Sequence, residues 1–254
     1  MTPNARFLLV LAVFLSLGSA CTYHVLTPPA RAFNMESAAP VKPRETVLGG
    51  RTGVMGGIFE PGAVIGTAGV RHGVAPNVEL NGELTFARIQ DNDENTRSVD
   101  RNAGATRIGV KAGNEFVAVT GGLGGGFAAI GNFGSVDLGG IVSMHNCYLV
   151  PFVSASGIAS ASLSDNNVVA FEDGRTSRPG PTVGFGAGVG LEFPLSRARC
   201  REGRTPPRLQ LGANTATLWG RHTSIDGPGL TPVTAWEKHG YVGAALGLEV
   251  PIDL

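Results

Sequence analysis

The stretch TVGFGAGVGLEF, residues 182–193, alternates between apolar and small or polar residues without a break. Its apolar members share one parity: Val183, Phe185, Ala187, Val189, Leu191 and Phe193. The other parity holds Thr182, four glycines and Glu192. Because successive side chains of a β-strand point to opposite faces, this stretch predicts a strand with one apolar face and one face of nearly bare backbone.

The same period of two recurs along most of the chain, for example in VELNGELTF at 78–86 and in TRIGVK at 106–111. It predicts about ten strands, near residues 45–58, 62–72, 77–89, 104–113, 115–129, 135–145, 148–161, 182–194, 207–220 and 240–252. Most are long enough to cross a membrane at the tilt of a barrel strand, which needs roughly 9–11 residues.

The connections between these strands predict how the barrel is oriented. Short links at 73–76, 113–114 and 146–147 alternate with links that include long polar loops at 90–103, 162–181 and 221–239; a longer link, 195–206, falls on the short side. Bacterial transmembrane barrels have short periplasmic turns, longer external loops and an even strand number. We therefore expect an all-β fold, a closed antiparallel up-and-down transmembrane β-barrel with a periplasmic N-terminus.

Alternation alone does not say which face meets lipid, since a soluble barrel alternates with the opposite sense. The glycine-rich parity favours a narrow lumen, where glycine leaves room for long side chains from other strands. A charged cluster shares the inward parity on three successive expected strands: Arg71, Glu79, Glu83, Arg107 and Lys111. Aromatic residues near strand ends on the apolar parity predict an interfacial girdle: Phe86, Tyr148, Phe152, Phe193 and Trp219.

The N-terminus predicts export. Arg6 precedes the apolar run FLLVLAVFLSLGSAC, which is typical of a signal peptide over residues 1–20. Its last five residues, LGSAC, resemble the lipobox of bacterial lipoproteins, which implies a lipid on Cys21; cleavage by the ordinary signal peptidase, leaving a plain thiol there, is the alternative. Residues 21–44 contain four prolines and no periodicity, and predict an anchor and flexible linker ahead of a barrel domain at 45–254.

Two stretches, VRHGVAPNVELNGELTFAR at 70–88 and GYVGAALGLEVPIDL at 240–254, carry a family resemblance. With the lipoprotein-type signal, the chain resembles small bacterial outer-membrane β-barrel proteins. The resemblance implies a place in the outer membrane of a Gram-negative bacterium, contact with membrane lipids, and insertion by the outer-membrane barrel assembly machinery. The chain departs from the family at Leu254, where an aromatic residue is usual.

Few residues point to chemistry. Cys147 and Cys200 fall in connections on the expected periplasmic side, where a disulfide and two free thiols are both open.

Residues 91–100 begin like a calcium loop with Asp91, Asp93 and Asn95, but Thr96 and Asn102 replace the required glycine and acid, so we assign no metal. His222, Asp226 and His239 share one expected external loop, a likeness in kind to the omptin proteases. With no matching motif, we expect no catalysis and no cofactor.

The chain has 20 basic and 20 acidic residues, so its neutral charge gives no reason to expect a nucleic-acid partner. We expect a structural or surface-interaction barrel. Two alternatives stay open: a narrow outer-membrane channel, and a soluble lipid-anchored periplasmic barrel that binds a small ligand.

Overall fold

A computed structural model describes residues 27–31, 34–56, 62–90, 102–128, 131–163, 169–170, 176–225 and 232–252. Among these residues, no helix is long and apolar enough to span a membrane. The strands are β1 (Thr46–Gly56), β2 (Gly62–Ala75), β3 (Val78–Gln90), β4 (Asn102–Gly113), β5 (Val117–Ala128), β6 (Gly131–Ser143), β7 (Val150–Ser162), β8 (Val169–Ala170), β9 (Thr176–Pro194), β10 (Arg208–Ile225) and β11 (Val233–Ile252), with one short helix, α2 (Arg197–Arg201).

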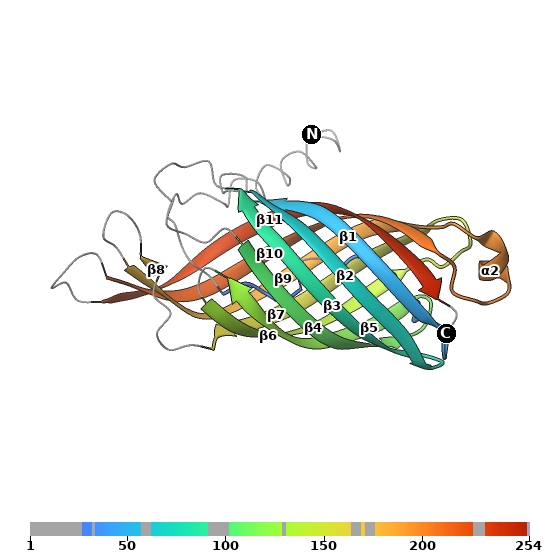
Figure 1. Ribbon diagram of the computed structural model, residues 1–254, viewed down its shortest axis with the longest axis horizontal. Coiled ribbons are helices and arrows are strands. Elements are labelled where there is room, and N and C mark those ends of the chain that lie inside the picture. The colour runs from blue at the N-terminus through green and yellow to red at the C-terminus, as the bar shows by residue number, and fades with distance from the viewer. Residues whose placement is uncertain are drawn as a thin grey trace, which may run out of the picture.

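The strands close into a barrel (Figure 1). Each of β1 to β6 pairs antiparallel with the next strand in sequence, β7 pairs with β9, and β9 pairs with β10. The ring is completed by β10 with β11 and by β11 with β1, in which Thr46 lies opposite Ile252. In the described part of the chain, ten strands form the wall, and β8 adds a two-residue pairing to β9. The expected closed antiparallel barrel is confirmed.

The two ends of the barrel differ. At the end that we call the short-turn end, the strands are joined at 76–77, 114–116 and 144–149, and by the longer connection 195–207 that contains α2. Figure 1 shows α2 and the C-terminal end of β11 at this end. The opposite end, which we call the loop end, holds the connections 57–61, 91–101, 129–130, 163–175 and 226–232.

Three strands extend further toward the loop end than expected. β9, β10 and β11 have 19, 18 and 20 residues, against 11–14 in β1 to β7. The expected loops 162–181 and 221–239 are therefore wrong in part, since 176–181, 221–225 and 233–239 are strand. Polar residues such as Arg221 and Lys238 occupy outward positions in these extensions. The alternation of apolar and polar residues that predicts a strand is therefore missing there.

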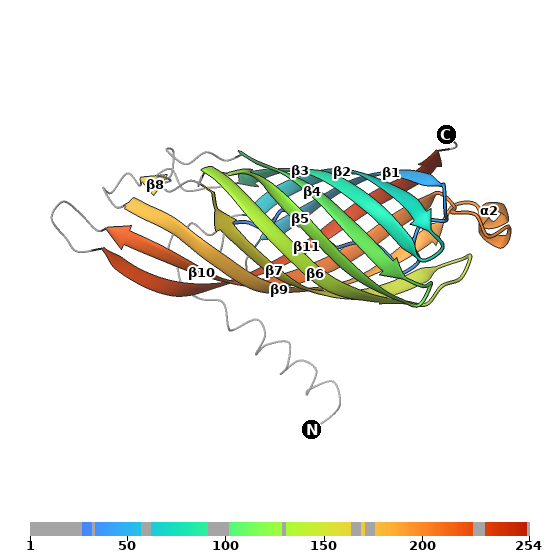
Figure 2. The same cartoon turned by 90° about the horizontal axis from the view of Figure 1, so that it is seen from below.

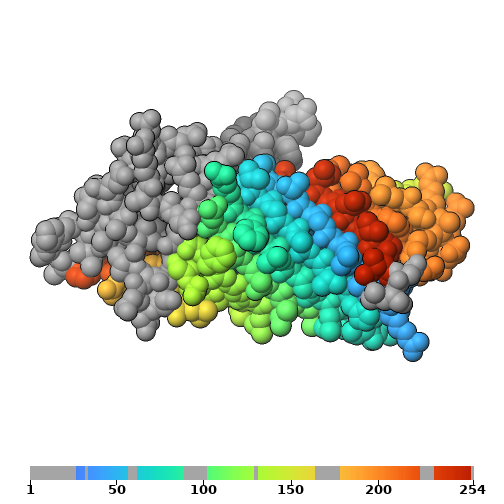
Figure 3. Space-filling view, viewed as in Figure 1, coloured from blue at the N-terminus to red at the C-terminus, as the bar shows by residue number. Residues whose placement is uncertain are grey.

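The wall has an apolar outer face and a polar inner face. On β4, Ile108 is 70% exposed and points outward, whereas Arg107 and Lys111 are 2% and 0% exposed and point inward. The same arrangement holds around the barrel, and Figure 3 shows the outer side chains of β1 to β6 as one continuous surface. The structure therefore has its apolar face outside, opposite to a soluble barrel.

The expected flexible linker is wrong for residues 27–31 and 34–41. Residues 27–31 and 34–44, which we call the plug segment, have an irregular conformation and lie inside the barrel as far as Val41, where the blue trace between the strands in Figure 2 follows them; residues 42–44 are exposed. Met35, Ala38 and Val41 are at most 2% exposed. Phe152, expected in the aromatic girdle, instead points inward at 3% exposure and joins Met35 and Ala38 in a small apolar cluster.

Candidate functional site: the plugged lumen

The lumen is organised around Arg71 on β2. Its guanidinium donates to both carboxylate oxygens of Glu79 at 2.9 and 2.8 Å, and to Glu249 on β11 at 2.8 Å. Arg51 on β1 donates to the other oxygen of Glu249 at 3.1 Å. Because each charge is buried together with at least two partners, these ion pairs join β1, β2, β3 and β11 through side chains as well as backbone.

A second group centres on Arg107. It donates to both oxygens of Asp137 on β6 at 2.7 Å and to Asn81 on β3 at 2.7 Å. Gly109 and Gly122 make this possible, since a side chain at either position would overlap the Arg107 guanidinium. This is the role expected of lumenal glycines.

The plug segment adds its own charges. Lys111 on β4 donates to Glu36 of the plug segment at 3.1 Å and to the backbone oxygens of Ser37 and Ala39 at 3.2 and 3.3 Å. Arg31 pairs with Glu36 and, at 3.0 Å, with Glu83 of the wall. The plug segment is therefore bound by ion pairs as well as by packing.

Backbone N–H groups of the plug segment also bind wall side chains. Ser37 donates to Glu192 at 2.7 Å, and Val41 donates to Glu79 at 2.7 Å. Glu192 in turn accepts from Arg208 at 2.8 Å, so the same carboxylate holds the wall and the plug segment. An irregular chain inside a barrel needs such partners, because its backbone groups have no strand neighbour.

The wall is shaped to receive this segment. A Cβ at Gly73 would collide with the backbone oxygens of Val41 and Lys42. A Cβ at Gly212 would lie 3.1 Å from the Cε atom of Met35, and one at Gly188 would lie 3.4 Å from the Asn34 oxygen. These glycines let the plug segment approach the strands.

The ion pairs of the lumen are balanced in the described residues. Six cations, Arg31, Arg51, Arg71, Arg107, Lys111 and Arg208, face six carboxylates, Glu36, Glu79, Glu83, Asp137, Glu192 and Glu249. The lumen has no excess of either sign among these groups, so it offers no single-sign field to attract an ion.

The five residues of the expected charged cluster all lie in this network. Sequence reasoning missed the cations Arg31, Arg51 and Arg208 and the carboxylates Glu36, Asp137, Glu192 and Glu249. A signal was present for the plug segment: Met35, Ala38 and Val41 are apolar residues in a stretch interpreted as a solvated linker. Solvated linkers are usually poor in such residues.

The structure joins Cys147, in the turn 144–149, to Cys200 in α2 as a disulfide with Cα atoms 5.7 Å apart. Arg197 of α2 lies 4.5 Å above the Tyr148 ring. Burial, together with the positive charge of Arg208, lowers the pKa of the neighbouring His145. These contacts connect two turns at the short-turn end.

His222 and His239 lie on the paired strands β10 and β11 rather than in a loop, and both are buried on the inner face. Their Nε2 atoms are 3.8 and 3.6 Å from the two carboxylate oxygens of Glu237.

Asp226, the third residue of the omptin-like group, lies outside the described residues, as do Cys21, the signal peptide, Leu254 and the calcium-like stretch 91–100. In the described residues, no group of three or more potential ligands is placed to hold a metal.

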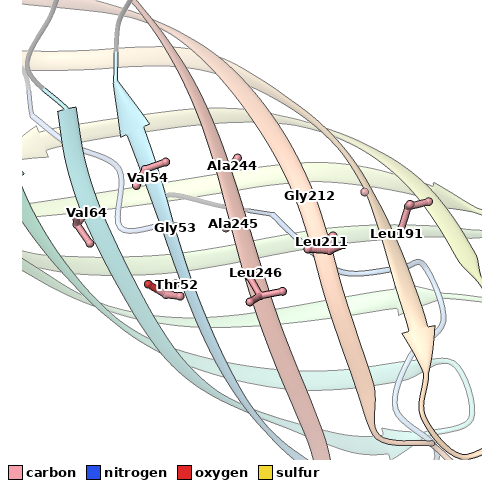
Figure 4. A pocket seen from close by; sticks show the side chains of 11 residues that line it. Thr52, Gly53, Val54, Val64, Leu191, Leu211, Gly212, Ala244, Ala245 and Leu246 are labelled. Carbon is pink, nitrogen blue, oxygen red and sulfur yellow. The ribbon is translucent and has the colours of Figure 1, made fainter.

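The outer wall carries a shallow hollow of about 650 Å³ over β1, β2, β9, β10 and β11 (Figure 4). Small residues form its floor, and Val54, Val64, Leu211 and Leu246 surround it. Its surface is almost wholly apolar, so it lacks the polar groups that orient a specific ligand.

Comparisons with known proteins concern the fold alone. No family model and no curated protein sequence matches the chain. Among solved structures, the chain is similar to the COG4313 outer membrane channel from Pseudomonas putida F1, at 10% identity over 86% of this chain and 100% of that chain, with a TM-score of 0.46. It is also similar to outer membrane protein OprG from Pseudomonas aeruginosa, at 8% identity, 85% and 99% coverage and a TM-score of 0.39. It is similar as well to outer membrane protein AlkL in lipid bilayers, at 10% identity over 88% of this chain and 97% of that chain, with a TM-score of 0.35.

Proposed function

We propose that this chain is an outer-membrane β-barrel protein with a structural or surface-interaction role, whose lumen is closed at rest by its own plug segment. The observation that carries the proposal is the burial of Met35, Ala38 and Val41 inside a lumen whose six described cations and six described carboxylates pair with one another. A barrel filled in this way provides a rigid frame that presents the connections of its loop end, and the proposal includes no catalytic step.

The membrane location rests on the outer face. Leu138, Val153 and Val189 are 66%, 56% and 56% exposed, and each lies on a different strand. Soluble monomers rarely expose contiguous apolar patches above a few hundred Å². Contact with lipid removes this apolar face from water. The exposed face therefore argues against the alternative of a soluble barrel that binds a ligand. Insertion then falls to the barrel assembly machinery of a Gram-negative outer membrane, with the short-turn end in the periplasm.

The narrow channel is the second candidate, and one observation favours it. Beside the plug segment, a lumenal cavity of about 40 Å³ is lined by Arg31, Asn34 and Asp137 and by the small residues Ser154 and Gly188. This space admits water, since a cavity of roughly 10–15 Å³ is enough for one molecule. Withdrawal of the plug segment would enlarge this cavity along the glycine-rich strand β9.

Single-channel recording in planar bilayers tests the proposal. We expect the native protein to give no stable current steps, and a variant lacking residues 27–41 to give them. Steady steps from the native protein would contradict a closed lumen.

A locked variant separates the two candidates. The backbone nitrogen of Ala30 lies 3.0 Å from the Ser135 hydroxyl, so an Ala30→Cys, Ser135→Cys pair is placed to tether the plug segment to β6. Current steps that appear under applied voltage in the native protein and in the reduced double variant, and that are abolished when the pair in the double variant is oxidised, would establish the channel.

A further inference from the structure

Positive charge is concentrated in one connection of the short-turn end. The connection 195–207 contains four arginines and a single glutamate. Three of these arginines, Arg197, Arg201 and Arg204, are exposed. With histidine counted as neutral, the three other turns at this end hold one charged residue between them, Glu115.

The end of the plug segment adds two more exposed cations beside this connection, Lys42 and Arg44. The backbone N–H of Lys42 donates to the Thr205 hydroxyl at 3.3 Å. Glu45 accepts from the backbone N–H of Thr205 at 2.9 Å and pairs with Arg204 at 3.5 Å. These contacts bring the two segments together in one basic surface, which consists of Lys42, Arg44, Arg197, Arg201 and Arg204.

The backbone that carries the basic surface is fixed by several contacts. The Cys147–Cys200 disulfide joins α2 to the turn 144–149. Ser196 caps the start of α2 by accepting from the backbone N–H of Arg199 at 3.4 Å, and the Arg199 Nε donates to the Thr205 carbonyl at 3.2 Å. A surface that is ordered in advance loses less conformational entropy when it binds a partner.

Exposed apolar side chains lie next to these arginines. Leu195 and Tyr148 are 58% and 57% exposed, and the Arg197 guanidinium lies 4.5 Å above the Tyr148 ring. Leu195 directly follows β9, so the apolar outer face of the wall continues into the basic surface. Tyrosine and arginine beside apolar residues are typical of the interface between a bilayer and water. This continuity favours a lipid over an acidic protein as the partner.

From this arrangement we propose that the basic surface binds the headgroups of anionic phospholipids in the periplasmic leaflet of the membrane. The guanidinium groups of Arg197 and Arg201 donate to phosphate oxygens, which arginine recognises well. Leu195 and Tyr148 contact the lipid just below the headgroup. The inference rests on the proposed function, which places the barrel in the membrane and the short-turn end in the periplasm.

Quenching of tryptophan fluorescence by lipids with brominated acyl chains tests the proposal locally. The protein is reconstituted in vesicles that mix phosphatidylcholine and phosphatidylglycerol, and one of the two lipids is brominated. A Leu195→Trp reporter, in a Trp219→Phe, Trp236→Phe background, detects the lipids beside α2. The native protein serves as the comparison, because its two tryptophans lie toward the loop end of β10 and β11.

At low salt we expect the Leu195→Trp reporter to detect a preference for phosphatidylglycerol of about fivefold, which is the effect of one basic residue near an anionic surface. Arg197→Gln with Arg201→Gln should remove this preference, whereas lysine at both positions should keep most of it. High salt should weaken it. The matched control, Arg221→Gln with Lys238→Gln, removes two charges near the loop end and should leave the preference unchanged.

Equal quenching by the two brominated lipids at the Leu195→Trp reporter overturns the inference, leaves the membrane location standing, and points to an acidic protein as the partner. A preference that the Arg221, Lys238 control lowers as much as the Arg197, Arg201 variant also overturns it, because net charge would then be the cause. If neither brominated lipid quenches any reporter, the proposed membrane location fails and the inference with it. Tyr148→Trp is the second reporter if Leu195→Trp does not accumulate.

Discussion

The two faces of β4 show opposite rules of burial within one strand. Arg107 and Lys111 are 2% and 0% exposed in the lumen, whereas Ile108 and Val110, between them in sequence, are 70% and 43% exposed on the outside. In a soluble protein the apolar pair would form the core. Here paired charges fill the interior, so the uniqueness of the fold depends on matched ion pairs and on the glycines that admit them.

The largest expected effect comes from breaking the inner face. Lys111→Ala removes the cation that Glu36, Glu79 and two plug-segment carbonyls share. Loss of one partner from a buried ion pair costs about 3–5 kcal/mol, because the remaining charge stays desolvated. We expect a decrease of that size in the free energy of unfolding, measured with urea in phospholipid vesicles.

Val110→Ala is the matched control, one residue away on the outer face. Removing two methyl groups that contact lipid leaves no cavity in a packed core, so we expect a loss below about 1 kcal/mol. Equal losses in the two variants would show that the inner and outer faces of β4 contribute alike.

The outer face is tested by Ile108→Arg, at the middle of β4. A cation facing lipid near the bilayer midplane costs about 2–4 kcal/mol in a barrel wall. We expect that loss in the same unfolding measurement, with Ile108→Leu close to the native protein. If Ile108→Arg instead stays fully folded and becomes soluble without detergent, the outer face does not meet lipid.

A smaller effect is expected at the short-turn end, away from both faces. Cys200→Ser should lower the free energy of unfolding by about 2 kcal/mol, the lower end for a disulfide, because β7, β9 and β10 already hold both turns. Cys147→Ser and chemical reduction should give the same loss, and the double variant no more. Additive losses from the two serine variants would contradict a bond between these residues.

The sequence predicts the wall well because its information is local. Two adjacent residues of opposite polarity, such as Arg107 and Ile108, indicate which face of a strand is apolar. The glycines that share one face of β9 indicate a filled lumen. The ends of β10 and β11 were harder to predict, since outward residues such as Arg221 and Lys238 no longer need to be apolar there.

The plug segment could not be predicted from local pattern. Glu36 accepts a hydrogen bond from Lys111, which is 75 residues away in sequence, and the backbone of Ser37 donates to Glu192, which is 155 residues away. Pairings of that range leave no period in the sequence, and the prolines around them are typical of a solvated linker. The apolar residues Met35 and Val41 were the available sign of burial.

The plug segment also constrains the order of events during assembly. Its partners lie on β3, β4, β6 and β9, and the ring that holds them closes through β1 and β11, where Arg51 meets Glu249 across 198 residues of sequence. Contacts of such long separation form slowly, because much chain entropy is lost before they are made. The plug segment is synthesised early but is thus among the last parts of the chain to reach its native partners. Its complete docking requires that the barrel has closed.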